Sequence, residues 1–119
     1  MSTIKQAMEE LMVSDGAMCA ALVDSGSGMI MGQIGSGVDL EVAAAGNTEV
    51  VRSKLKTMRA LGLNDVIEDI LITLGKQYHI LRPMARKEGL FIYLVLDKSK
   101  ANLAMARRKV QDVEKELMV

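Results

Sequence analysis

The sequence predicts an α+β fold in which helices cover both faces of an antiparallel sheet. Amphipathic helical periods occur near both ends and in the middle of the chain, two short apolar runs follow the first period, and three more precede the last. Layers of helices on a sheet are the natural way to bury such elements. With 119 residues, we expect one domain over residues 1–119 that buries about two-thirds of its unfolded surface.

Composition and charge narrow the class of protein. The 15 basic and 15 acidic residues cancel, so no general positive field attracts nucleic acid or anionic lipid. The N-terminus lacks the apolar core of a signal peptide, and no apolar run approaches the ~20 residues that span a bilayer. We therefore expect a cytoplasmic protein. Cys19, the one cysteine, lies in an apolar run, which predicts a buried thiol in a reducing compartment rather than a reactive or metal-binding one.

The first third of the chain predicts a helix and then a β-hairpin. Apolar residues recur every three or four positions from Ile4 to Leu11, and Thr3 with Gln6 can form a capping box at the start of this helix. Apolar runs at 17–23 and 29–34 flank a polar link that contains glycine. Glycine reaches positive φ without strain, so this link is typical of a hairpin turn.

A long amphipathic helix is predicted next, from a cap at Asp39 to about Leu61. Its apolar sector is wider than one contact with a sheet requires, so part of it can meet a second surface. Asn47 and Lys54 lie inside this sector. Either they find hydrogen-bond partners at a subunit interface, or Lys54 extends to solvent from an otherwise ordinary helix.

Three strands and a final helix complete the prediction. The strands span 66–74, 77–82 and 90–96, and Pro83 ends the second because it has no N–H for the ladder. The first and third strands are apolar on both alternating sets, which predicts that both of their faces are covered. The last helix is expected to begin near Lys98, with Asp97 or Ser99 as its cap.

The stretch from Tyr78 to Leu103 carries a family resemblance. A strand that ends at Pro83, an apolar strand at 90–96, and Asp97 followed by Ala101-Asn102-Leu103 resemble the Roadblock domain family, and the match extends from about Ala17 to Leu117. The resemblance implies a profilin-like α/β/α sandwich with a five-stranded antiparallel sheet. It places the long helix on one face and the terminal helices on the other. The whole chain is then a single Roadblock-like domain.

The resemblance also implies a function. Roadblock domains are small non-catalytic dimeric platforms that bind Ras-like GTPases or motor subunits, and they dimerise through the third strand and the middle helix. By this resemblance we expect a homodimeric scaffold that binds a partner protein, namely a small Ras-like GTPase. The apolar strand at 66–74 has no charge at its centre, and an unprotected edge of this kind normally finds another strand. The expected interface residues are Asn47, Val50, Val51, Lys54, Leu55, Met58, Ile70 and Ile72.

Few residues are suited to catalysis or metal binding. His79 is the single histidine, and its place within a strand favours a half-buried packing residue over a base. A zinc site needs three or four Cys or His ligands, and the chain has two such residues. The two Gly-Ser-Gly segments lack the continuation of a dinucleotide fingerprint or a P-loop, so both are interpreted as turns. We expect no catalytic, cofactor or metal site.

Two alternative functions remain open from the sequence. Sheets of the profilin-like type also carry small-molecule pockets, so a ligand-sensing module is the second hypothesis, although no convergent polar groups are evident. An enzyme is the third. A cleft that brought together His79, Tyr78 and Arg82 would favour it.

Overall fold

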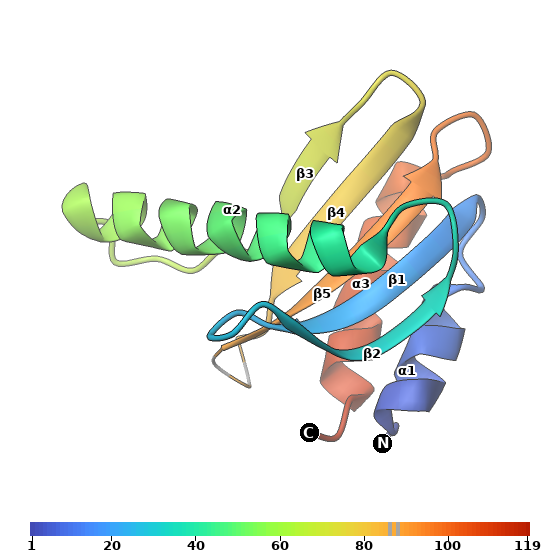
Figure 1. Cartoon of the computed structure of the whole chain (residues 1–119), viewed down its shortest axis with the longest axis horizontal. Helices are drawn as coiled ribbons and strands as arrows, with labels where there is room; N and C mark the ends of the chain where they lie inside the picture. Colours follow the sequence, from blue (N-terminus) through green and yellow to red (C-terminus); the bar gives the residue numbers. More distant parts are fainter. Residues whose placement is uncertain (86, 88) are drawn as a thin grey trace.

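Five strands form one antiparallel sheet in the order β2-β1-β5-β4-β3 (Figure 1), as a computed structural model of the chain shows. The structure describes every residue except 86 and 88. The predicted α+β class and the five-stranded antiparallel sheet are confirmed. The elements are α1 (Ile4–Leu11), β1 (Ala17–Asp24), β2 (Met29–Gly35), α2 (Leu40–Ala60), β3 (Ile70–Thr73), β4 (Gln77–Pro83), β5 (Leu90–Asp97) and α3 (Leu103–Glu116).

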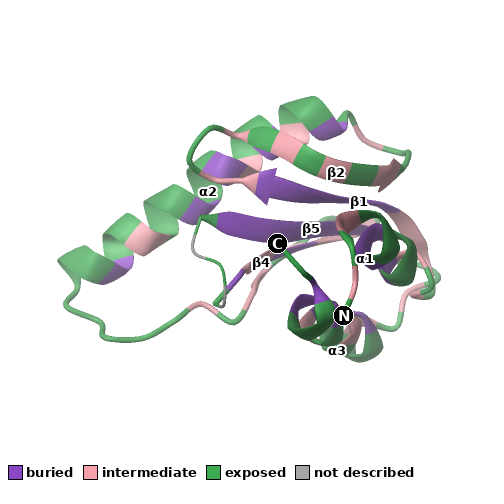
Figure 2. Cartoon of the chain, turned by 90° about the horizontal axis from the view of Figure 1, so that it is seen from below, coloured by how far each residue is buried: buried purple, intermediate pink, exposed green. Residues whose placement is uncertain are grey.

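The helices lie on the two faces of the sheet as expected, with α1 and α3 on one face and α2 on the other (Figure 2). The central strands β1 and β5 send alternate side chains into the two layers. Leu22 and Leu94 pack beneath α1 and α3, whereas Val23 and Val95 pack beneath α2. Cys19 belongs to the α2 layer and is buried, as predicted.

Local capping explains where the first two helices begin. The N–H of Gln6 donates to Oγ1 of Thr3 over 3.2 Å and the N–H of Thr3 donates to Oε1 of Gln6 over 2.9 Å, so the predicted capping box is confirmed. At α2, Oδ1 of Asp39 accepts from the N–H groups of Glu41 and Val42. Beyond this cap α2 runs across the sheet and extends past its margin (Figure 1).

The third strand is shorter than predicted. Only Ile70–Thr73 is a strand, because its ladder with β4 stops at the pair Ile70 and Leu81. The next residues of β4 are Arg82 and Pro83. Pro83 has no N–H to donate. The carbonyl oxygen of Glu68 accepts from Nη1 of Arg82 over 2.8 Å instead of from a backbone N–H. Residues 64–69 therefore approach the sheet without joining it.

Two further expectations were wrong. Strand β3 is not covered on both faces, because it is the last strand of the sheet and Leu71 keeps 38% of its surface exposed. Helix α3 begins at Leu103 rather than near Lys98. Asn102 caps it by accepting from the N–H of Met105, whereas the carboxylate of Asp97 accepts from the N–H and hydroxyl of Ser99 and closes a turn instead. Among the helices described, α2 included, none combines the length and apolar character that crossing a bilayer requires.

Candidate interaction surface

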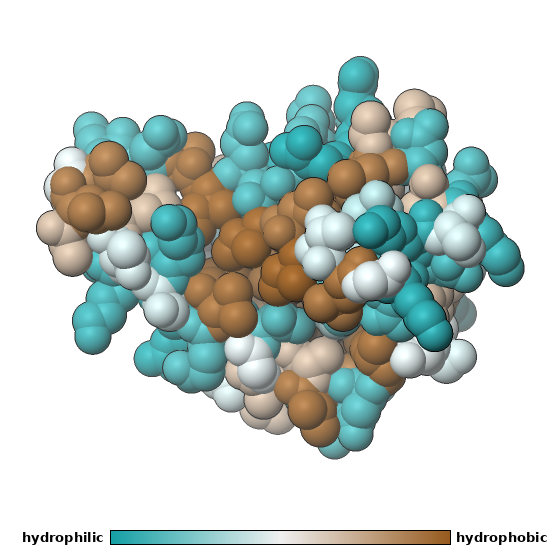
Figure 3. All heavy atoms as spheres, turned by 90° about the horizontal axis from the view of Figure 1, so that it is seen from above, coloured by the Kyte–Doolittle hydropathy of each residue, from teal (hydrophilic) through white to brown (hydrophobic). Residues whose placement is uncertain are grey.

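An exposed apolar area connects α2 with the open edge of β3. Val50 on α2 is 38% exposed, and Leu55, Ile70 and Ile72 are half-buried against the core layer beneath α2. Figure 3 shows hydrophobic side chains forming a continuous band on this side of the molecule. We call this area the α2–β3 surface, and it consists of Val50, Leu55, Leu61, Leu63, Ile70 and Ile72.

A groove deepens the α2–β3 surface beside the protruding end of α2. The groove has a volume of about 610 Å³ and runs between α2 and residues 63–69. Both apolar and charged side chains line it. The lining residues are Lys54, Met58, Leu63, Asp65, Val66, Ile67, Glu68, Asp69 and Arg107.

The predicted interface residues surround one apolar core layer but differ in how much surface they offer. Val51 and Met58 are only 2% and 8% exposed, so their side chains are already used inside the chain. The remaining six residues are half-buried or exposed, on α2 and on β3. These six are Asn47, Val50, Lys54, Leu55, Ile70 and Ile72. Their role in a subunit interface stays a prediction.

Polar side chains connect α2 with β4 beneath the same surface. The hydroxyl of Tyr93 lies 2.9 Å from Nδ1 of His79, and Nε2 of His79 lies 2.8 Å from Oε1 of Gln77. An amide oxygen only accepts, so Nε2 carries the proton and Nδ1 accepts from Tyr93. Burial lowers the pKa of His79 below its ordinary value. Burial raises the pKa of Tyr93 to about 12, and the nearby thiol of Cys19 adds to this effect. A hydrogen bond from Asn47 acts in the opposite direction and lowers the pKa.

The His79 network is arranged for packing rather than for base catalysis. Both ring nitrogens are engaged, so neither is directed at a substrate. Tyr78 and Arg82 lie at alternate positions of β4 and face the α1 and α3 layer, whereas His79 faces the α2 layer. The three side chains therefore do not converge on one cleft. The described residues also include no group of three or more Cys, His, Asp or Glu side chains placed to hold a metal ion.

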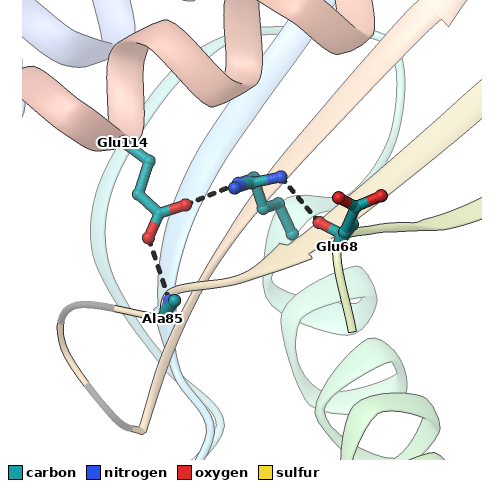
Figure 4. Close-up of polar contacts among 4 residues, drawn as sticks. Glu68, Ala85 and Glu114 are labelled. Carbon is teal, nitrogen blue, oxygen red and sulfur yellow. Dashed lines mark hydrogen bonds and ion pairs between the residues drawn. The ribbon is translucent and has the colours of Figure 1, made fainter. Parts of the chain in front are cut away.

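A shielded ion pair fixes the segment that leads into β3. Nε of Arg82 lies 2.5 Å from Oε1 of Glu114 on α3, and Oε2 of Glu114 accepts from the N–H of Ala85 over 2.9 Å (Figure 4). The same guanidinium donates a hydrogen bond to the carbonyl oxygen of Glu68. Sequence reasoning missed this site. The available signal was that Glu114 lies on the apolar stripe of α3, four residues after Val110.

No family model matches the sequence, and a search of the curated proteins finds no similar sequence. Solved structures do match. A Roadblock/LC7 domain from Streptomyces avermitilis superposes with a TM-score of 0.82 at 13% identity, over 97% of this chain and 94% of that one. The chain has the Roadblock fold. MglB from Myxococcus xanthus gives a TM-score of 0.82 at 16% identity, over 95% of this chain and 89% of MglB.

Other proteins with the Roadblock fold extend the comparison. MglC from Myxococcus xanthus gives a TM-score of 0.63 at 13% identity, over 95% of this chain and 94% of MglC. The superpositions show a shared fold, and at identities of 13–16% they leave the interface residues of this chain to be tested on the chain itself. Within the fold, the α2–β3 surface is where an uncovered helix flank and an open strand edge lie on the same cluster of core residues.

Proposed function

We propose that this protein is a non-catalytic homodimeric scaffold, acting in the cytoplasm, which binds a small Ras-like GTPase. The observation that carries the proposal is the α2–β3 surface. There, apolar side chains of α2 lie on the same core layer as Ile70 and Ile72 of the edge strand β3. A second copy covers the helix flank and the strand edge together.

The edge of β3 supports pairing with an identical strand. Its residues, Ile70–Thr73, carry no charge, and the outer N–H and C=O groups of an edge strand are open for another ladder. A two-fold axis that lies beside β3 and is perpendicular to the sheet makes two such strands antiparallel. It also brings the two α2 helices together on one face. In this arrangement Asn47, Val50, Lys54, Leu55, Ile70 and Ile72 make the contacts. Val51 and Met58 support them from the core.

Similar proteins support self-association and a role in binding other proteins. One solved structure of the same fold is of MglB in a tetrameric arrangement, with a TM-score of 0.82 and 15% identity. Another is of the gliding protein MglB from Thermus thermophilus, with a TM-score of 0.73 and 16% identity. The GTPase as partner comes from the Roadblock resemblance of the sequence rather than from a particular residue.

The test has two parts, mass and binding. Sedimentation velocity at low micromolar concentration is expected to give a mass of two copies or a multiple of two. The purified chain is then titrated with the small Ras-like GTPases of its own organism, each loaded either with a non-hydrolysable GTP analogue or with GDP. Binding that depends on the nucleotide supports the proposal. A stable monomer contradicts the dimer, and equal absence of binding in both nucleotide states contradicts the GTPase as partner.

A further inference from the structure

The opposite margin of the sheet has a second open edge. Strand β2 is the outermost strand on that side, and its residues alternate between exposed and half-buried along its whole length (Figure 2). No charged residue occurs between Asp24 and Asp39. Charges and prolines are the usual means of keeping an edge strand from pairing, and β2 has neither.

A β-bulge limits the regular part of this edge. The register with β1 shifts between Leu22 and Val23, because Leu22 pairs with Gly32 and Val23 pairs with Ile30. Met31 is the extra residue and is 47% exposed. The segment after the bulge, residues 32–35, keeps a regular ladder with β1 on one side and leaves its other side open.

Helix α1 borders the β2 edge and forms a groove with it. The groove has a volume of about 490 Å³, and Ile4, Met8, Met31 and Ile34 line its apolar part. Gly32 allows α1 to lie this close to the strand, because a Cβ at that position would overlap the side chain of Ile4.

Two opposite charges lie along the α1 side of the groove. Lys5 and Glu9 are one helical turn apart and both line it. Both side chains are exposed, and the ion pairs recorded for the described residues do not involve either of them. If a two-fold axis relates two copies across the β2 edge, their α1 helices run antiparallel. Lys5 of one copy then faces Glu9 of the other, and the contact occurs twice.

The spacing of a sheet with helices fits such an arrangement. Adjacent strands lie about 4.8 Å apart and packed helices about 10 Å apart. Two neighbouring helices on one face of a sheet are therefore separated by the width of two strands. Helix α1 contacts both β1 and β2. A second copy whose β2 continues the sheet therefore places its own α1 beside the first at an ordinary packing distance, over the groove.

We propose that the β2 edge and the α1 groove form a second self-association surface, at which two copies pair their β2 strands antiparallel and pack α1 against α1. The occupant is another copy of this chain, because the uncharged edge and the Lys5 and Glu9 pattern are both complementary to themselves. The contact is independent of the α2–β3 surface. Together the two surfaces use both edges of the sheet and join dimers into larger assemblies.

Charge reversal with restoration tests the proposal. Sedimentation velocity of the wild type, from low to several hundred micromolar, is expected to show species larger than two copies. Lys5→Glu places four carboxylates at the contact and is expected to raise its dissociation constant about tenfold. Lys5→Glu combined with Glu9→Lys restores opposite charges and is expected to restore the wild-type constant. Lys100→Glu, at an exposed position between β5 and α3, is the control and leaves association unchanged.

Failure here is distinguishable from failure of the α2–β3 dimer. In a Val50→Glu background, which is designed to disrupt the α2–β3 surface, the β2 contact alone gives a dimer that Lys5→Glu weakens. A wild type that stays at two copies over the full concentration range and dissociates on Val50→Glu alone overturns the β2 contact and leaves the α2–β3 dimer standing. A charge swap that fails to restore association overturns the proposed pairing as well.

Discussion

Arg82 on β4 and Glu114 on α3 form a shielded ion pair, in which Nε and Oε1 lie 2.5 Å apart and the side chains are 17% and 4% exposed. The pair is more than a link between two elements. Arg82 also donates a hydrogen bond to the carbonyl oxygen of Glu68, and Glu114 accepts one from the N–H of Ala85. Because these bonds meet at one guanidinium and one carboxylate, the segment entering β3 has a fixed position relative to α3. The open edge of β3 is therefore presented in a defined place.

Arg82→Met should destabilise the fold strongly, because it removes both the ion pair with the shielded carboxylate of Glu114 and the hydrogen bond to the carbonyl oxygen of Glu68. Breaking a buried pair by removing one partner costs about 3 kcal/mol. The matched control is Arg108→Met, which removes the exposed pair that Arg108 forms with Asp112 over 3.8 Å. That loss is expected to cost less than about 0.5 kcal/mol. Urea denaturation of the two variants measures both values, and equal losses would contradict the structural role of Arg82.

The sequence predicts elements best where one local pattern decides them. The capping box at Thr3 and the Asp39 cap of α2 depend on residues three positions apart, and both are present. Two boundaries depend on distant partners. Strand β3 starts late because Arg82, fourteen residues from Glu68, donates to the carbonyl oxygen of Glu68. Helix α3 starts late because Asp97 bonds Ser99 instead of capping the helix.

The candidate surface is only partly readable from the sequence for a similar reason. Helical periodicity places Val50, Val51 and Met58 in one apolar sector, and it cannot distinguish which part of the sector the sheet covers. The structure shows that Val51 and Met58 face the chain's own core, whereas Val50 stays exposed. The ion pair at Glu114 was missed because its partner lies 32 residues away in sequence.

At low micromolar concentration, where association through the β2 edge is weakest, Val50→Glu should separate the α2–β3 dimer into monomers while the subunit stays folded. The side chain is 38% exposed in the single chain, so a carboxylate there remains hydrated, but two-fold pairing buries it twice without a partner. We expect the dissociation constant to rise at least about a hundredfold, or roughly 2.7 kcal/mol. Val42→Glu, on the exposed flank of the same helix, is the control. Light scattering after gel filtration measures the mass, and an unchanged mass for Val50→Glu would exclude this surface.

Stability should decrease as the pH falls below neutrality, and His79 should be the cause. Its pKa in the folded chain is lower than the ordinary value of 6.5, because burial disfavours the imidazolium. The unfolded chain therefore binds the proton first, so this contribution is complete above pH 6.5 and is lost as the pH falls toward the folded pKa. One proton gives a slope of at most about 1.4 kcal/mol per pH unit.

His79→Gln removes the titrating group, so its unfolding free energy should lack that slope between pH 7 and pH 5. The chain has no other histidine, the side chain whose charge ordinarily changes between pH 5 and pH 8. Denaturant unfolding at several pH values gives the slope for each protein. A wild type and a His79→Gln variant with the same pH dependence would show that the network of His79 and Tyr93 is not the source.

Gly35→Ala should destabilise the β1–β2 pairing, because Gly35 has a φ of 80°, which L side chains rarely adopt. An added Cβ would also overlap the backbone carbonyl oxygen of Met18 on β1, and backbone cannot move aside as a flexible side chain can. The two effects together are expected to cost about 2 kcal/mol or more. Gly75→Ala is the control, because a Cβ there meets no heavy atom within 4 Å. Thermal and urea unfolding measure the difference.

Because Gly35 ends β2, Gly35→Ala should also weaken any association through the β2 edge, whereas Gly75→Ala should leave it unchanged.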